Sequence, residues 1–137
     1  MERTLVLIKP DAMQRNLACT ILSRLEENGL RLAALRMLHL DKATAERHYS
    51  VHRDKPFFKD LVAYISSAPI VAAVFEGEGV VEKARKAMGA TDPAKSEKGT
   101  IRGDFGIDIE HNSIHGSDSA ETAEKEIAFF FNKDEIF

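Results

Sequence analysis

The chain has 137 residues, which is enough for one domain with a substantial core and too few for two. Hydrophobic residues make up 44% and charged residues 30%, an ordinary globular balance, and no apolar run is long enough to cross a bilayer. The net charge of −3 gives no support for non-specific binding to nucleic acid, so any anion site must be a local basic cluster.

The cellular compartment is indicated by two features of the sequence. Cys19 is the only cysteine, which excludes an internal disulfide and favours a reducing compartment. The N-terminal residues enter a strand pattern directly, without the basic and apolar regions of a secretory leader. We therefore expect a single cytoplasmic domain over residues 1–137.

The first elements predicted along the chain form a strand–helix–strand unit. Residues 4–9 are a short apolar run typical of a strand. Pro10 then begins a helix, since its fixed φ is tolerated in the first turn, and this helix continues to Gly29. A second strand is predicted over residues 30–40, with only partial alternation of apolar side chains.

Two helices, a strand and a further helix are expected next. Residues 42–52 favour a helix with few apolar positions, and Pro56 opens another. Residues 70–75 are nearly all apolar, as in a strand covered by helices on one face and by an interface on the other. A helix over residues 80–88 ends at Gly89. The helix that starts at Pro56 has an apolar stripe made of Phe57, Phe58, Leu61, Val62 and Ile65.

The last third of the chain predicts a long functional loop, a short strand and a helix. Residues 90–112 show no periodicity, and loops of that length in a small domain are usually functional or disordered. A strand is expected over residues 113–115, before an amphipathic helix. This order of elements predicts an α/β (α+β) fold of the ferredoxin-like, split βαβ type. It would have a four-stranded antiparallel sheet with helices on one face.

The chain has five histidines, of which His115 has the most informative neighbours. His39 and His111 are most simply surface or loop residues. His48 and His52 have the i, i+4 spacing of a zinc site, but no Cys or Glu set completes it, so solvated side chains are the simpler interpretation. His115 is followed by Gly116, which permits a close approach of the backbone.

The residues after His115 can be interpreted in two ways. Ser117 or Asp118 can cap the following helix, whose N-terminal N–H groups would attract an anion beside the imidazole. Alternatively, Asp118-Ser119-Ala120-Glu121 is only a capping box, and His115 is an ordinary loop residue.

Phosphoryl transfer through a histidine requires an oriented ring surrounded by cations. Glu126 lies eleven positions after His115, so its carboxylate could orient the ring nitrogen that does not attack. Arg85 and Arg102 could clamp a phosphate. The alternative is that Glu126 is an exposed helix acid and that both arginines lie on the surface.

Three motifs decide between these interpretations. They are Leu7-Ile8-Lys9-Pro10-Asp11-Ala12, Gly99-Thr100-Ile101-Arg102-Gly103-Asp104-Phe105 and Asn112-Ser113-Ile114-His115-Gly116-Ser117-Asp118-Ser119. In this order, and over essentially the whole chain, they closely resemble the nucleoside diphosphate kinase family. The resemblance implies Mg²⁺-dependent exchange of the γ-phosphate between nucleoside tri- and diphosphates. The route would be ping-pong, through a phosphohistidine on Nδ1 of His115.

The resemblance also assigns residues to the sugar and the phosphates. Lys9 and Asn112 would bind ribose and phosphate oxygens. The residues surrounding the phosphates would be Tyr49, Arg85, Thr91 and Arg102.

A second group of implied residues serves the base, the histidine and the metal. Phe57 would stack on the base, with Ile109 opposite and Leu61 beside it. Ser117 and Glu126 would support the histidine, and Asp118 would reach Mg²⁺ only through water. Stacking on an aromatic ring accepts every base, so we expect broad base specificity.

Departures from the family pattern concern packing and assembly. Asn16 and Cys19 stand where many members have glycine, which should affect packing or the start of a helix, and no site residue changes. The chain ends soon after the last helix, without the tail that longer members use against a neighbouring subunit. We expect a homo-oligomer, and the choice between dimer, tetramer and hexamer stays open. Neither a membrane nor a specific nucleic acid is expected as a partner.

Two other functions fit the sequence less well. A non-catalytic nucleotide-binding protein of the same fold should have lost members of the site, whereas His115, Lys9, Arg85, Arg102 and Asn112 are all present. A hydrolase using Ser117 or Ser119 with His115 lacks the strand–turn–helix context of a serine nucleophile.

Overall fold

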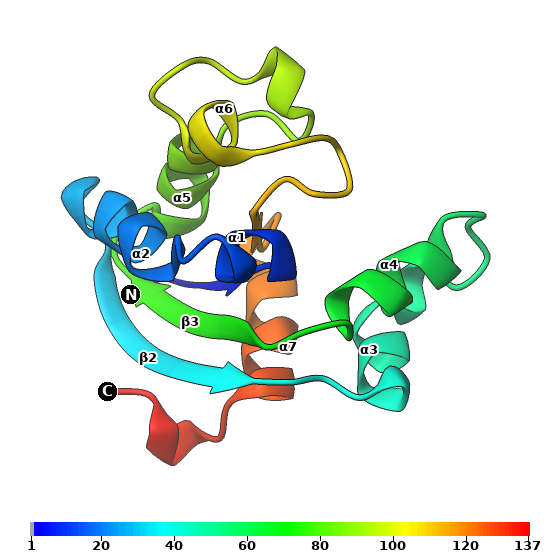
Figure 1. Ribbon diagram of the computed structural model, residues 1–137. Coiled ribbons are helices and arrows are strands. Elements are labelled where there is room, and N and C mark those ends of the chain that lie inside the picture. The colour runs from blue at the N-terminus through cyan, green and yellow to red at the C-terminus, as the bar shows by residue number, and fades with distance from the viewer. Residues whose placement is uncertain (1) are drawn as a thin grey trace.

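A computed structural model describes residues 2–137; Met1, the first residue of the expected domain, lies outside the described residues. One antiparallel sheet of four strands runs through the molecule in the order β2-β3-β1-β4 (Figure 1). The strands are β1 (Arg3–Ile8), β2 (Arg31–Leu38), β3 (Ile70–Glu76) and β4 (Ile114–Gly116). The predicted α+β fold is confirmed, and the short strand expected at residues 113–115 forms one residue later.

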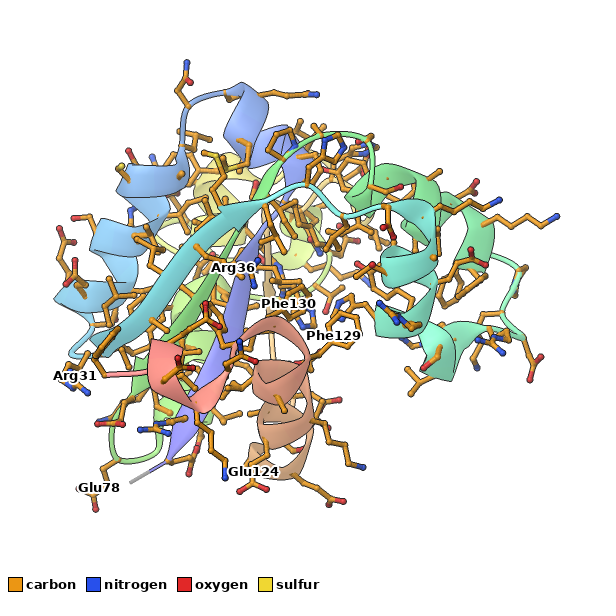
Figure 2. All side chains as sticks on the ribbon, turned by 90° about the horizontal axis from the view of Figure 1, so that it is seen from below. Arg31, Arg36, Glu78, Glu124, Phe129 and Phe130 are labelled. Atoms are coloured by element: carbon orange, nitrogen blue, oxygen red, sulfur yellow. The ribbon has the colours of Figure 1, made fainter. Side chains whose placement is uncertain are left out.

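The two central strands, β1 and β3, are buried on both faces. Leu5 and Leu7 of β1 pack into one core, and the alternate residues Val6 and Ile8 pack into another. Figure 1 shows α1 (Pro10–Gln14), α2 (Ala18–Glu27) and α5 (Val80–Met88) on one side of the sheet and α7 (Ala120–Phe130) on the other. Figure 2 shows this second side from below, with Phe129 and Phe130 at the end of α7. The expectation of helices on one face, with an interface covering the other face of residues 70–75, is therefore wrong. Continuously apolar strands need cover on both sides, and this chain supplies it from its own helices.

A break divides the first helical region into α1 and α2, where one continuous helix was predicted. Asn16 has a φ of 58°, the left-handed conformation that a right-handed helix cannot include. Asparagine tolerates this conformation better than most residues, and glycine tolerates it best. Cys19 lies exposed on α2.

Two short helices, α3 (Lys42–His48) and α4 (Phe58–Ile65), lie together at one end of the sheet (Figure 1). A 3₁₀ turn over Ser50–His52 follows α3, so the α-helix ends earlier than predicted. Phe57 is the N-cap residue of α4 and stays outside the core. Val62 and Ile65 carry the buried face of α4.

Residues 90–112 contain more structure than predicted. A 3₁₀ turn spans Pro93–Lys95, and helix α6 covers Ile101–Phe105. Thr100 begins α6 by accepting a hydrogen bond from the backbone N–H of Gly103. A helix of five residues is too short to show a periodic pattern in the sequence.

The last helix, α7, begins where it was predicted but with a different cap. Ser119, rather than Ser117 or Asp118, accepts the hydrogen bond from the backbone N–H of Thr122. A final 3₁₀ turn covers Lys133–Glu135. Within residues 2–137, none of the helices combines the length and apolar character needed to cross a membrane.

Candidate active site

A pocket of about 630 Å³ opens beside β4 and brings together segments from most of the chain. This volume lies in the range of small-molecule sites. Every site residue predicted from the sequence lines the pocket except Ser117, which lies behind it. The residues come from the end of β1, the α3–α4 region, α5, α6, the loop before β4, β4 itself and α7.

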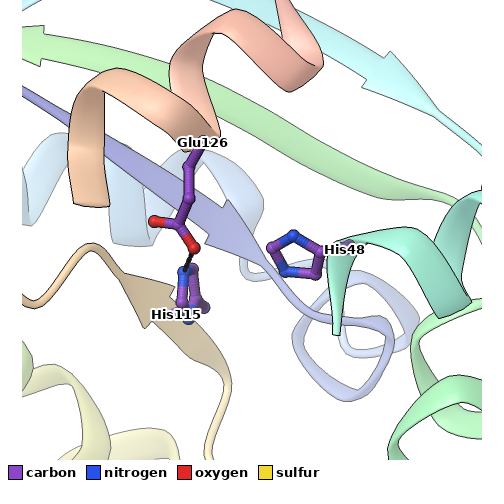
Figure 3. Close-up of side chains that lie close together, drawn as sticks. All are labelled: His48, His115 and Glu126. Carbon is purple, nitrogen blue, oxygen red and sulfur yellow. Dashed lines mark hydrogen bonds and ion pairs between the residues drawn. The ribbon is translucent and has the colours of Figure 1, made fainter. Parts of the chain in front are cut away.

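His115 is held at the floor of this pocket by Glu126. Strand β4 places His115 opposite Leu7 of β1, and α7 packs Glu126 back against the strand. His115 Nε2 lies 3.0 Å from Glu126 Oε2 (Figure 3), and Ser117 Oγ donates to Glu126 Oε1 at 2.5 Å. The Ser117 oxygen in turn accepts a hydrogen bond from the backbone N–H of Leu5 at 3.3 Å. The carboxylate is therefore fixed from two sides.

This arrangement selects one tautomer of His115. Burial alone would raise the pKa of Glu126, but the hydrogen bond and charge of His115, with the hydrogen bond from Ser117, bring the pKa below its usual value. An ionised carboxylate only accepts hydrogen bonds, so the ring proton must sit on Nε2. Nδ1 then carries the lone pair available for a reaction.

Lys9 supplies a buried cation to the pocket. Its Nζ donates to Asn112 Oδ1 at 2.8 Å, and Asn112 Nδ2 donates to the Thr91 carbonyl at 2.9 Å. The Lys9 N–H also donates to the Ser113 carbonyl at 2.9 Å, which ties the loop before β4 to the end of β1. Burial, assisted by the charge of Arg102, lowers the pKa of Lys9 to about 8.

Two guanidinium groups extend the positive charge. Arg102 is buried on α6 and donates to the carbonyls of Gly89 at 3.1 Å and Ile114 at 2.8 Å. Its Nε is buried without a hydrogen-bond partner among residues 2–137. Burial and the neighbouring Arg85 lower the pKa of Arg102 to about 10. Arg85 is exposed on α5 and lines the same pocket, so both arginines face one site rather than the bulk surface.

An apolar mouth is formed by Phe57, Leu61 and Ile109. The Phe57 side chain is 43% exposed and Ile109 is 59% exposed, whereas the adjacent Phe58 packs against the core. Large apolar groups left exposed at a pocket entrance indicate a ligand surface. A flat ring held here could contact Phe57 and Ile109.

Tyr49 and Asp118 complete the predicted set. Tyr49 follows α3, where burial and the charge of Glu126 raise its pKa to about 12, so its hydroxyl stays protonated. Asp118 is exposed at the edge of the pocket. Neither a hydrogen bond nor an ion pair occupies its carboxylate within residues 2–137.

His48 and Glu110 also line the pocket, although neither was predicted. The His48 ring meets that of His115 edge to face, with ring centroids 5.7 Å apart. The expectation of a solvated His48 is therefore wrong: burial, with the charge of His115, lowers its pKa to about 4. The sequence signal that was available for His48 is its place directly before Tyr49, a residue already assigned to the site. Glu110 gave none, because it lies in a loop without periodicity.

The combination of an oriented imidazole, three cations and an apolar mouth defines a site suited to a nucleotide phosphate. Residues 2–136 match the family model described as nucleoside diphosphate kinase. The chain belongs to the nucleoside diphosphate kinase family, which transfers phosphate between nucleotides. It is a phosphotransferase.

Curated relatives and solved structures agree with this membership. A nucleoside diphosphate kinase of Dehalococcoides mccartyi is 64% identical over 136 residues, covering 99% of this chain and 96% of the relative. The Aquifex aeolicus nucleoside diphosphate kinase superimposes with a TM-score of 0.97 at 43% identity, covering 99% of both chains. A halophilic nucleoside diphosphate kinase from Halobacterium salinarum, solved in complex with CDP, has a TM-score of 0.96 at 46% identity. That match covers 99% of this chain and 91% of the other.

Proposed function

We propose that this chain moves the γ-phosphate of a nucleoside triphosphate to a nucleoside diphosphate in two half-reactions through His115. Nδ1 attacks the γ-phosphorus, the bond to the β–γ bridging oxygen breaks, and the diphosphate leaves. A second diphosphate then attacks the phosphorus with its terminal oxygen and regenerates the ring. The observation that carries this proposal is the Ser117–Glu126–His115 chain, which occupies Nε2 and leaves Nδ1 as the nucleophile.

The surrounding residues have separate tasks in this reaction. Arg85, Arg102 and Lys9 would stabilise the charge on the transferring group, since its transition state needs mainly electrostatic help. Thr91, Asn112 and the Tyr49 hydroxyl would hold phosphate and ribose oxygens. These contacts would hold the phosphate in line with His115, and this lowers the entropic part of the activation barrier.

A magnesium ion would enter with the nucleotide. Asp118 is suited to it as an exposed carboxylate at the pocket edge, whereas Glu126 is already occupied by His115 and Ser117. Mg²⁺ commonly uses one carboxylate, several waters and substrate phosphates, and it supplies charge neutralisation there. The resemblance to the family implies that Asp118 would contact the ion through water.

Broad base specificity follows from the apolar mouth. Phe57 and Ile109 would contact the faces of a base, and every base has such a face. The groups proposed for sugar and phosphate act on features common to all nucleotides.

A two-nucleotide assay tests the proposal most directly against its alternatives. Initial rates with varied ATP and varied GDP should give parallel double-reciprocal lines, the pattern of a covalent intermediate. Intersecting lines would contradict the two-step route. Binding of both nucleotides without exchange would favour a non-catalytic protein, and hydrolysis without transfer would favour a hydrolase.

The cellular location and the oligomeric state are inferred from the sequence. The single cysteine supports a cytoplasmic location. The resemblance supports a homo-oligomer. Sedimentation of the purified chain would distinguish a dimer from a tetramer or hexamer.

A further inference from the structure

Three potential metal ligands converge in the lining of the pocket. His48 extends from α3, His115 from β4 and Glu126 from α7 (Figure 3). One donor atom from each lies within 4.8 Å of the other two. Among the residues that the structure describes, this is the one group of histidine, cysteine and acidic side chains with such geometry.

We propose that His48, His115 and Glu126 form an inhibitory site for a divalent transition metal of the zinc type. Two imidazoles and one carboxylate, with a fourth position left to water, form a common zinc set. Such nitrogen and carboxylate donors favour zinc over magnesium, which prefers oxygen ligands alone. The open fourth position would face the nucleotide pocket.

The distances require only a small adjustment. Donors around a tetrahedral zinc ion lie about 3.3 Å apart, given metal–ligand distances of roughly 2.0–2.1 Å. His115 Nε2 and Glu126 Oε2 are already 3.0 Å apart. The His48 nitrogen, within 4.8 Å of both, must approach by at most roughly 1.5 Å.

His48 has a chemical reason to approach the other two donors. Its Nε2 is buried and has no hydrogen-bond partner among residues 2–137. A buried polar atom without a partner costs free energy, and a metal ion would supply the missing partner. Glu126 is already oriented for metal binding, because the hydrogen bond from Ser117 fixes its Oε1 atom. Carboxylates that bind metals are commonly oriented by such a hydrogen bond from a residue that does not touch the metal.

Metal binding and phosphorylation exclude each other through the tautomer of His115. The ring now carries its proton on Nε2, where Glu126 accepts it. Coordination uses the Nε2 lone pair, so a neutral ring must carry the proton on Nδ1 instead. Nδ1 then has no lone pair for attack. This consequence rests on the proposed role of His115, whereas the metal site itself does not.

The site is tested first by binding, without nucleotide. Calorimetric titration with Zn²⁺ should show one tight site per chain. Loss of a residue that only hydrogen-bonds a metal ligand typically lowers metal affinity roughly 10- to 100-fold. Loss of a ligand itself should cost more, so His48→Asn should weaken the affinity for Zn²⁺ by at least about 100-fold. His39→Asn is the matched control, because His39 is remote from the site and bonds the Ser66 carbonyl. Absence of tight binding, or equal affinity in wild type and His48→Asn, would overturn the proposal.

A measurement on the unaltered chain covers the case in which His48→Asn does not fold. X-ray absorption at the zinc edge of the zinc-loaded wild type should show two imidazoles and oxygen donors. A shell with a single imidazole or a sulfur ligand would contradict the site.

The kinetic consequence is measured by single-turnover phosphorylation with ATP and Mg²⁺ at fixed free Zn²⁺. Zinc should slow wild type and His39→Asn at least tenfold, and His48→Asn much less, each relative to its own zinc-free rate. Equal inhibition of all three proteins would mean that zinc acts on the nucleotide instead, and would overturn the inhibitory role. If zinc-free wild type forms no phosphoenzyme, the proposed function fails, while the binding result still judges the metal site.

Discussion

The carboxylate of Glu126 is held by His115 on one oxygen and by Ser117 on the other, so its effect should fall on rate rather than on binding. Glu126→Gln keeps the shape but cannot enforce the proton on Nε2. We predict a 10- to 100-fold slower phosphorylation, roughly the effect of losing an orienting partner of a metal-bound histidine. Single-turnover rates at saturating ATP, with nucleotide affinity nearly unchanged, check this prediction. Equal rates would remove the orienting role from Glu126.

Lys9 makes nucleotide binding depend on pH. Its pKa, lowered to about 8 by burial and by Arg102, means that the side chain is charged below pH 8 and becomes neutral above it. We therefore expect affinity for ADP to fall as the pH rises from 8 to about 9.5. The Tyr49 hydroxyl, with a pKa near 12, does not titrate in this window.

A matched variant isolates the effect of Lys9. In Lys9→Met the affinity should be weaker throughout, and most of the decline between pH 8 and 9.5 should disappear, because Arg102, with a pKa of about 10, stays mainly charged in this range. Equilibrium titrations with ADP at constant ionic strength make the comparison. A decline that persists in Lys9→Met would assign the pH dependence to another group.

Phe57 should contribute to binding alone. Because its ring is exposed at the pocket mouth, Phe57→Ala removes stacking worth roughly 1–3 kcal/mol per base and leaves His115 in place. We expect all nucleoside diphosphates to bind more weakly by similar factors, with transfer retained. Dissociation constants for a purine and a pyrimidine diphosphate measure this. Loss confined to purines would show that Phe57 reads the base in another way.

Local motifs predicted the pocket residues that lie within them, but not a pocket residue that lies outside them. Lys9, Asn112 and His115 lie in short motifs whose order along the chain could be recognised. His48 could not be placed, because only the packing of α3 against α7 brings its ring to His115. Burial of a polar side chain by a distant element leaves no local pattern.

At the scale of elements, two serines near the start of α7 have different tasks. Ser119 caps the helix, and Ser117 supports Glu126. Ser119→Ala should lower the free energy of unfolding by about 1 kcal/mol and leave phosphorylation intact. Ser117→Ala should slow phosphorylation. Denaturant titration and single-turnover rates separate the two effects, and an exchange of these outcomes between the variants would reverse the assignment.

Long periodic helices and apolar strands were predictable, whereas breaks and short helices were not. The separation of α1 from α2 depends on the φ of a single residue, Asn16, within an otherwise helical pattern. Helix α6 has only five residues and depends on the Thr100 cap and on burial of Ile101. Such features arise from tertiary contacts, which outweigh weak local propensity.

Across the whole molecule, the double burial of the sheet explains how so small a chain builds a rigid site. Cores on both faces fix β1 and β3, and β1 in turn positions β4 through its backbone pairing. Helix α7 covers the sheet and carries Glu126 to His115. The continuous apolar run of residues 70–75 indicated burial, but it could not show that the second cover comes from the chain itself.

The central claim is that His115 carries the phosphoryl group between nucleotides, and intact mass spectrometry tests it most directly. After incubation with ATP and Mg²⁺ and removal of nucleotide, the protein should be heavier by one phosphoryl group. The adduct should be lost in acid, retained in base, discharged by a nucleoside diphosphate, and absent from His115→Ala. A wild-type protein without the adduct, or an adduct that persists in folded His115→Ala, would contradict the account.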